Sequence, residues 1–261
     1  MTNKKKNAIQ PLPAMPKWLI PFVVIILAGL VFFTAQFAAN LILSLYALGR
    51  GWTANYANTW LAQSITAQFV FVVLAESFTV GLIYLILRHY GKSLSRIGLS
   101  KRIKPVWFLY SLLAYPFYLV IYLVLFLIIA HIFPSITVNE TQHIGFSSVH
   151  GTYQLVLTFV SLVILPPIAE EVLFRGFLFE GLKKAMPVIY AGLLTSILFA
   201  GGHLPEGGSA GLLWVGAIDT FCLSLVLVFL KQRTNSLWPG IGLHALKNLV
   251  AFVDLFVRLK R

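Results

Sequence analysis

Long apolar runs, separated by short polar connections, set the pattern of the whole chain. Most of these runs reach the roughly 20 residues that a helix needs to cross the hydrocarbon core of a bilayer. They cover residues 18–46, 59–87, 106–132, 152–182, 188–203, 212–230 and 240–257. The pattern predicts an all-α fold, a polytopic transmembrane helical bundle with about seven to eight spans.

The overall composition points the same way. The 261 residues are 59% hydrophobic and 11% charged, whereas soluble domains are about a quarter charged. A large soluble core is therefore excluded. Cys222 is the only cysteine, which excludes an internal disulfide and a cysteine-based metal cluster, and its apolar surroundings predict a packed thiol.

The positive residues gather in alternate connections between the apolar runs. They precede the first run and fill the second, fourth and sixth connections: Lys4, Lys5, Lys6, Lys17; Arg88, Lys92, Arg96, Lys101, Arg102, Lys104; Lys183, Lys184; Lys231, Arg233. Cytoplasmic connections collect basic residues, so this placement explains the net charge of +12 without a nucleic-acid partner and predicts a cytoplasmic N-terminus. The densest patch, residues 89–105, is expected either to lie on anionic lipid headgroups or to be a solvated loop.

The chain divides into a short tail and one domain. Residues 1–16 are polar, basic and rich in proline, and we expect a flexible basic cytoplasmic tail there. Residues 17–261 then form a single transmembrane domain, since no linker or internal repeat separates a second one. Seven spans would place the basic C-terminal residues outside, against the positive-inside rule, so the last span is expected to be broken, shallow or miscounted.

The fourth run carries the charges that are hardest to explain by packing. Glu170, Glu171 and Arg175 lie in a stretch that is otherwise apolar from residue 155 to 182, and ionisable groups at membrane depth are functional candidates. Glu171 and Arg175, four residues apart, are expected to pair. Glu170 is rotated by about 100° and stays outside that pair. The two prolines at 166 and 167 are expected to kink the helix or start a new segment.

Polar groups recur in short patterns on three of the predicted helices. The patterns are Glu170-Glu171-x-x-x-Arg175, Phe199-x-x-x-His203 and His244-x-x-x-Asn248. At about 1.5 Å per residue, Glu170 and His203 lie roughly 20 and 24 Å from the cytoplasmic helix ends, and His244 and Asn248 roughly 12 and 18 Å. The four side chains can therefore meet in one buried cavity. Neighbouring glycines, Gly201, Gly202, Gly240 and Gly242, are expected to permit close helix approach.

These residue types predict amide hydrolysis without a covalent nucleophile. A desolvated carboxylate holds protons tightly and can act as a general base toward water, a role for which Glu170 is the candidate, with His203 holding the water. His244 and Asn248 can donate hydrogen bonds to the developing oxyanion, worth about 3 to 4 kcal/mol per donor. Glu171 and Arg175 give support. A purely structural polar network is the alternative.

Taken together, the three patterns resemble the CPBP (Abi) family of CAAX prenyl endopeptidases and their bacterial relatives. The resemblance covers residues 152–253 and implies an intramembrane endopeptidase of a bacterial cell membrane, multi-pass, with a peptide or membrane-protein substrate. It implies Glu170, His203, His244 and Asn248 as catalytic residues, supported by Glu171, Arg175 and Phe199. The family is by tradition described as metalloproteases, and a zinc ion would take Glu170, His203 and His244 as ligands. The resemblance is also compatible with a metal-independent glutamate mechanism, which is the one we favour.

Two other functions stay open at this stage. The first is a non-catalytic membrane immunity or scaffold protein of the Abi type, in which the same residues only organise packing. The second is a small transporter that uses Glu76 or Asp219 as a proton carrier, although no inverted repeat supports it. Both acids are expected instead to pair with polar groups such as Lys247.

Overall fold

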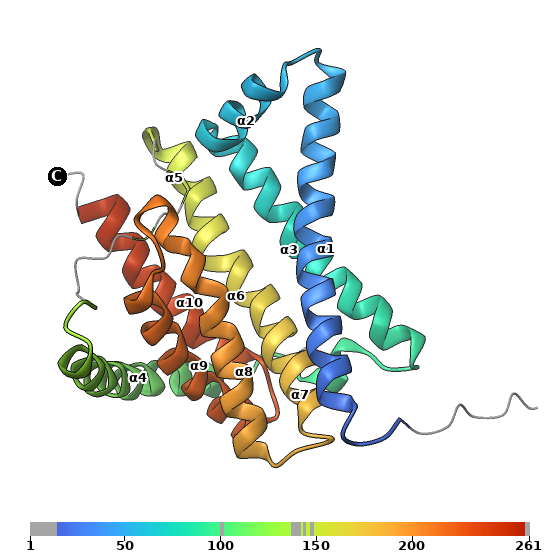
Figure 1. Cartoon of the computed structure of the whole chain (residues 1–261), viewed down its shortest axis with the longest axis vertical. Coiled ribbons are helices and arrows are strands. Elements are labelled where there is room, and N and C mark those ends of the chain that lie inside the picture. The colour runs from blue at the N-terminus through green and yellow to red at the C-terminus, as the bar shows by residue number, and fades with distance from the viewer. Residues whose placement is uncertain (1–14, 100–101, 137–141, 143–144, 147–148, 259–261) are drawn as a thin grey trace, which may run out of the picture.

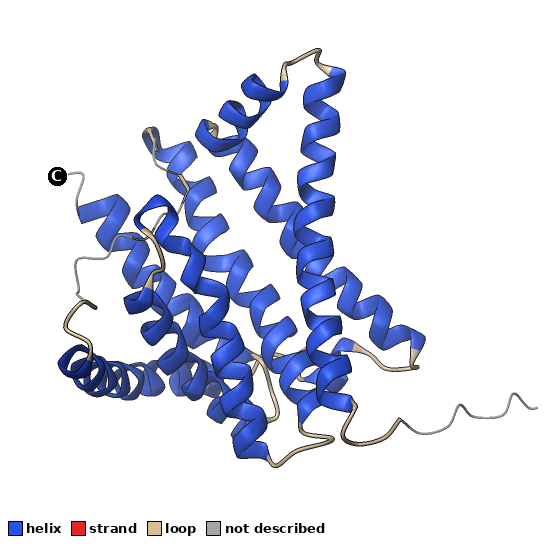
Figure 2. Cartoon of the chain, in the orientation of Figure 1, coloured by secondary structure: helices blue, strands red, loops and turns tan. Residues whose placement is uncertain are grey.

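The computed structural model describes residues 15–99, 102–136, 142, 145–146 and 149–258 (Figure 1). The tail predicted over residues 1–16 lies almost wholly outside them. The described residues form helices and loops without a strand (Figure 2). Within this described part of the chain, seven helices are long and apolar enough to cross a membrane: Ile20–Gly49, Ile65–His89, Pro105–Ile132, Gly151–Leu182, Val188–Gly208, Trp214–Thr234 and Trp238–Val257. The predicted all-α, multi-pass bundle is thereby confirmed.

The second apolar run is broken where we expected one continuous helix. It divides into α2 (Ala54–Gln63) and α3 (Ile65–His89). Ser64 separates them because its backbone is extended, with φ −84° and ψ 111°, and its Oγ accepts a hydrogen bond from the amide of Ala67 at 3.3 Å. Serine favours this capping position over the helix interior. The predicted start of the second span at residue 59 is therefore wrong.

The remaining long helices follow the predicted runs closely. They are α1 (Ile20–Gly49), α4 (Pro105–Ile132), α8 (Val188–His203), α9 (Trp214–Thr234) and α10 (Trp238–Val253). Short 3₁₀ turns follow α3 (η1, Leu94–Ile97) and α8 (η4, Leu204–Ala210). The last span runs without a break through α10 and continues into π-helical turns (η5, Asp254–Arg258). The expectation that this span is broken is therefore wrong for its described residues.

The fourth span changes its winding several times along its length. It consists of α5 (Gly151–Phe159), π-helical turns (η2, Val160–Ile164), α6 (Leu165–Glu170), a second π-helical stretch (η3, Glu171–Leu178) and α7 (Phe179–Leu182). Pro166 and Pro167 occupy the first turn of α6, where their missing N–H groups cost least. The predicted new segment ahead of the acids is confirmed.

This fourth span lies at the centre of the bundle (Figure 1). Its segments contact α1, α3, α8, α9 and α10, while α1 packs along α3, and α4 packs on α9 and α10. The outer surface is apolar: Phe33 on α1 is 70% exposed and Leu112 on α4 is 61% exposed. Such a surface suits lipid rather than water. Cys222 on α9 is fully buried, as expected of a packed thiol.

Candidate active site

Glu171 is locked into the packed interior by Arg175. The Arg175 Nη1 group donates to Glu171 Oε1 at 2.7 Å, and both residues are completely buried. The second guanidinium nitrogen donates to Ser224 Oγ on α9 at 2.5 Å, and that hydroxyl donates to Ser196 Oγ on α8 at 2.9 Å. The predicted pair therefore exists, and it ties the fourth span to two further helices.

Glu170, one residue earlier, lies outside this network. Its Oε2 atom is buried and forms no hydrogen bond with any described residue. The nearest ionisable contact is His244 Nε2, at 3.7 Å. A buried carboxylate oxygen without a donor is costly in a folded protein and is a candidate for function. The prediction that Glu171 pairs with Arg175 while Glu170 stays outside that pair is thus confirmed.

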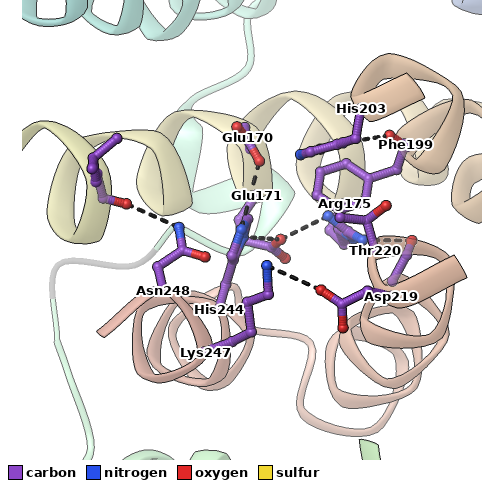
Figure 3. Close-up of polar contacts among 12 residues, drawn as sticks. Glu170, Glu171, Arg175, Phe199, His203, Asp219, Thr220, His244, Lys247 and Asn248 are labelled. Carbon is purple, nitrogen blue, oxygen red and sulfur yellow. Dashed lines mark hydrogen bonds and ion pairs between the residues drawn. The ribbon is translucent and has the colours of Figure 1, made fainter. Parts of the chain in front are cut away.

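His203 lies across a cavity from Glu170, at the end of α8. The two residues line one cavity of about 400 Å³, whose remaining walls are apolar side chains of α1, α8 and η3, such as Phe32, Leu173 and Leu198, together with Glu206. In Figure 3 the imidazole of His203 points toward Glu170. We call this space the site cavity. Its size falls in the range of small-molecule and peptide side-chain pockets.

A hydrogen bond to the backbone carbonyl of Phe199 determines which nitrogen of the His203 imidazole carries the proton. His203 Nδ1 lies 2.9 Å from the carbonyl oxygen of Phe199. A carbonyl only accepts, so Nδ1 must be the donor, and in the neutral ring Nε2 keeps its lone pair. Nε2 has Glu206 Oε1 at 3.9 Å. The neutral ring therefore presents an acceptor on this side.

Phe199 itself is fully buried and supports three other groups. Its ring stacks under the Arg175 guanidinium, 4.3 Å from the ring centroid, and meets the rings of Phe174 and His244 edge to face at 4.9 and 5.8 Å. Cation–π and aromatic contacts of this kind hold their partners in place. Phe199 thus connects the arginine to both histidines.

His244, on α10, bridges the two acids. Its Nδ1 lies 3.5 Å from Glu171 Oε1 and its Nε2 lies 3.7 Å from Glu170 Oε2. Gly240, one turn earlier, allows this approach, because a Cβ there would lie 2.8 Å from Glu171 Oε2. The prediction that glycine permits close helix approach is therefore confirmed at Gly240. It is wrong at Gly201 and Gly202, where a Cβ would meet nothing within 4 Å.

Asn248 lies one turn beyond His244 and is engaged elsewhere. Its Nδ2 donates to the carbonyl of Leu162 at 2.9 Å, away from the site cavity (Figure 3). That carbonyl needs a side-chain donor because its partners at i+4 and i+5 would be the N–H groups of Pro166 and Pro167, which have none. The amide keeps a second N–H that can donate to another acceptor.

Several polar neighbours of the site were not predicted. Ser196 and Ser224 carried no signal beyond being small hydroxyl residues in apolar helices, which often mark helix contacts. Glu206 follows His203 by three residues, a spacing that could have placed it beside the imidazole. It lines the site cavity, and its Oε2 accepts a hydrogen bond from Gln142 Nε2 at 2.5 Å.

Asp219 forms the pairing that we expected for it. Lys247 Nζ on α10 lies 3.1 Å from Asp219 Oδ2 on α9, and the hydroxyl of Tyr118 on α4 donates to Oδ1 of the same carboxylate. Three helices are joined at this point. The acid is therefore held in a closed polar cluster, which suits packing better than proton carriage.

The predicted zinc ligands do not come together as a ligand set. Across the residues that the structure describes, no three His, Cys, Asp or Glu side chains are grouped so that they could hold a metal ion. Glu170 and His203 face one cavity while His244 lies between the two acids, and His203 Nδ1 is already engaged. Zinc dependence stays a prediction for metal analysis.

Comparison with known proteins identifies the segment that carries these residues. Residues 151–250 match the family model described as Rce1-like, type II CAAX prenyl endopeptidase. Searches of curated proteins and of solved structures each found no significant match. The matched segment includes all three polar patterns, from Glu170 to Asn248. The resemblance predicted from those patterns is thus confirmed for residues 151–250 of this multi-pass protein, which match the model of the CPBP/CAAX prenyl protease family.

Proposed function

We propose that the protein is an intramembrane endopeptidase that hydrolyses a peptide bond with a water molecule activated by Glu170. The observation that supports this most directly is the site cavity, where the buried, unbonded Oε2 of Glu170 lies near the lone-pair side of His203. A base and a second acceptor on one cavity are what a water nucleophile requires. The family of the matched segment supports the same class of reaction.

The proposed reaction uses each group in turn. The water oxygen forms a bond to the peptide carbonyl carbon as one of its protons passes to Glu170, while His203 Nε2 holds the water in place. The negative charge that develops on the carbonyl oxygen is stabilised by donors from His244 and from the second N–H of Asn248. The C–N bond then breaks as the proton on Glu170 is transferred to the leaving nitrogen.

The packed side of the site gives the reaction its geometry. The Arg175 pair holds Glu171, and Glu171 in turn positions the His244 ring through Nδ1 at 3.5 Å. Nε2 then faces Glu170 and the reacting atoms, and it donates to the oxyanion when the ring carries a proton on both nitrogens. Glu171, Arg175 and Phe199 are thus positioning residues rather than catalytic ones.

The substrate that fits the site cavity is an apolar or lipid-modified peptide. The walls contributed by α1 and α8 are Phe, Leu, Ile and Ala side chains, and Phe33 on the rim is 70% exposed on the lipid-facing surface. We propose a peptide or membrane-protein substrate that reaches the site from the bilayer of a bacterial cell, with the N-terminus of the enzyme in the cytoplasm. The basic connections support this orientation.

The test is a cleavage assay with purified full-length protein in liposomes. Two internally quenched peptides of equal length serve as probes, one ending in a prenylated CAAX motif and one apolar and unmodified. We expect Glu170→Gln and His203→Ala to lower kcat/KM by about 10²- to 10⁴-fold, because each removes a group that handles the water. His150→Ala, an exposed histidine outside the cavity, is the matched control and should cleave normally.

Full activity of Glu170→Gln would reject the assigned site. A non-catalytic immunity role is distinguished by challenging bacteriocin-sensitive cells that express the protein. Undiminished protection by Glu170→Gln, at normal expression, would favour binding over hydrolysis. Metal analysis of the active preparation tests zinc: stoichiometric zinc lost together with activity on chelation would establish a metal enzyme.

A further inference from the structure

A second cavity lies at the end of the bundle where α1 begins, away from the acids. It measures about 610 Å³. Its inner wall is apolar and is formed by Ile20, Val23, Val24 and Leu27 of α1, with Leu87 of α3 and Phe177 of η3 opposite. We call it the basic-end cavity because of the residues at its mouth. Its volume lies within the range of sites that hold small ligands.

Four cations surround the mouth of the basic-end cavity. Lys92 and Arg96 come from the connection after α3, and Lys183 and Lys184 from the connection after α7. These segments are far apart in sequence and meet only through the fold. Among the described residues, the one carboxylate that lines the cavity is Glu180. Positive charge therefore exceeds negative charge at this mouth.

The single carboxylate is already shared by two ammonium groups. Glu180 Oε1 lies 2.9 Å from Lys183 Nζ and 3.1 Å from Lys231 Nζ. Within the described residues, Lys92, Arg96 and Lys184 have no ion-pair partner. Partial burial lowers the pKa of the Lys184 ammonium, and the positive charge of Lys92 lowers it further. Three cations thus repel one another around an apolar recess.

The basic-end cavity is separate from the site cavity, although both use α1. The residues of α1 that line the basic-end cavity are at positions 20, 23, 24 and 27, and those that line the site cavity are at 25, 28, 29, 32 and 33. At about 100° per residue, these two sets lie on nearly opposite faces of the helix. A ligand in one cavity therefore does not enter the other.

We propose that the basic-end cavity binds an anionic phospholipid. The phosphate group would lie between Arg96, Lys92 and Lys184, and the glycerol and the first part of the acyl chains would lie against Val23, Val24 and Leu27. Arginine and lysine are the side chains that recognise phosphate, and a recess that joins cations to an apolar wall matches the two ends of this ligand. A free inorganic anion or an acidic peptide would contact only the cations at the mouth and not the apolar wall.

The test measures lipid binding to the purified full-length protein in neutral detergent by isothermal titration calorimetry. The probes are dioctanoyl phosphatidylglycerol, dioctanoyl phosphatidylcholine and glycerol 3-phosphate. We expect saturable binding of the phosphatidylglycerol, at least about tenfold tighter than either of the other two. The double variant Arg96→Gln/Lys184→Gln should weaken the affinity for phosphatidylglycerol by about thirtyfold, since each cation near an anionic lipid contributes about fivefold to the affinity.

The matched control is Arg88→Gln/Lys104→Gln, which removes one arginine and one lysine from exposed positions at the same end, outside the cavity. It should bind as the unmodified protein does. Leu27→Trp fills the apolar recess and should weaken lipid binding while leaving the cations in place. Circular dichroism and gel filtration establish that each variant is folded, and Lys184→Gln alone serves if the double variant is not.

Three results would overturn the proposal. The first is equal affinity for the two lipids, and the second is an equal loss in the control double variant. The third is binding of glycerol 3-phosphate or of a hexaglutamate peptide as tight as that of phosphatidylglycerol, because either would show that the apolar recess is not used.

Discussion

Two adjacent acids of the fourth span have opposite surroundings. Glu171 is enclosed by Arg175 and Gly240 on the packed side, whereas Glu170 lies on the site cavity that it shares with His203. The backbone step between them is one residue, but the rotation about the helix axis is about 100°. That rotation turns one carboxylate toward a counter-ion and the other toward a space that a substrate can enter.

The contrast shows how a membrane-embedded site can be both stable and reactive. An unpaired charge within the bundle is costly, so a reactive carboxylate requires a rigid frame that other interactions supply. Here the frame is the neighbouring pair, which ties η3 to α8 and α9 through Ser196 and Ser224. Stability is concentrated on one face of the helix and reactivity on the other.

The largest expected difference is in the stability of two isosteric variants. Glu171→Gln leaves the buried Arg175 guanidinium without its counter-ion, and arginine cannot lose its proton, so we expect the free energy of unfolding to fall by about 3–5 kcal/mol. Glu170→Gln removes a buried charge that has no donor and should leave stability unchanged or higher. Thermal unfolding in detergent, followed by helical circular dichroism, measures both. Equal losses would show that the two acids are not distinct in their surroundings.

A smaller effect is expected from filling the gap between α10 and the packed acid. Gly240→Ala places a Cβ 2.8 Å from Glu171 Oε2, so the helix must shift, and we expect a loss of about 1–3 kcal/mol. Gly201→Ala on α8 is the matched control, because a Cβ there meets nothing within 4 Å. It should be neutral or stabilise by up to about 1 kcal/mol, since alanine favours a helix over glycine. If Gly240→Ala behaves like its control in the same unfolding assay, the close approach of α10 to Glu171 does not contribute to stability.

The smallest expected effect concerns the prolines and Asn248. Asn248→Leu leaves the Leu162 carbonyl without a donor and should cost about 1–2 kcal/mol. Pro166→Ala restores an N–H four residues after Leu162, so the asparagine should matter less in that background. A double-mutant cycle then gives a coupling of about 1 kcal/mol. Additive losses would mean that the side chain does not replace the missing backbone donor.

Much of the site was predictable because helical spacing translates directly into shared faces. The pairing of Glu171 with Arg175 followed from four-residue spacing, and the break at Pro166 from the missing N–H. Contacts between helices far apart in sequence did not follow from any spacing. Ser224 beneath Arg175, and the engagement of Asn248 by Leu162, depend on how α9 and α10 dock against the fourth span.

The second span shows the same limit at the level of a single residue. The stretch from residue 59 to 87 is mostly apolar, so the pattern predicts one helix. The chain instead ends α2 at Gln63 and restarts at Ile65, with Ser64 as the cap. A lone serine within an apolar run is compatible with either outcome, because it can point inward or cap.

The sequence alone determined that this is a multi-pass helical protein and which polar residues are expensive to bury. Both properties are local, since they follow from the length of apolar runs and from the periodicity of one helix. Only the tertiary structure decided that Glu170 and His203 share a cavity, that His244 lies between two carboxylates, and that four cations meet at the basic-end cavity. Those contacts join segments tens of residues apart, and their geometry depends on how the helices pack rather than on the order of residues within any one of them.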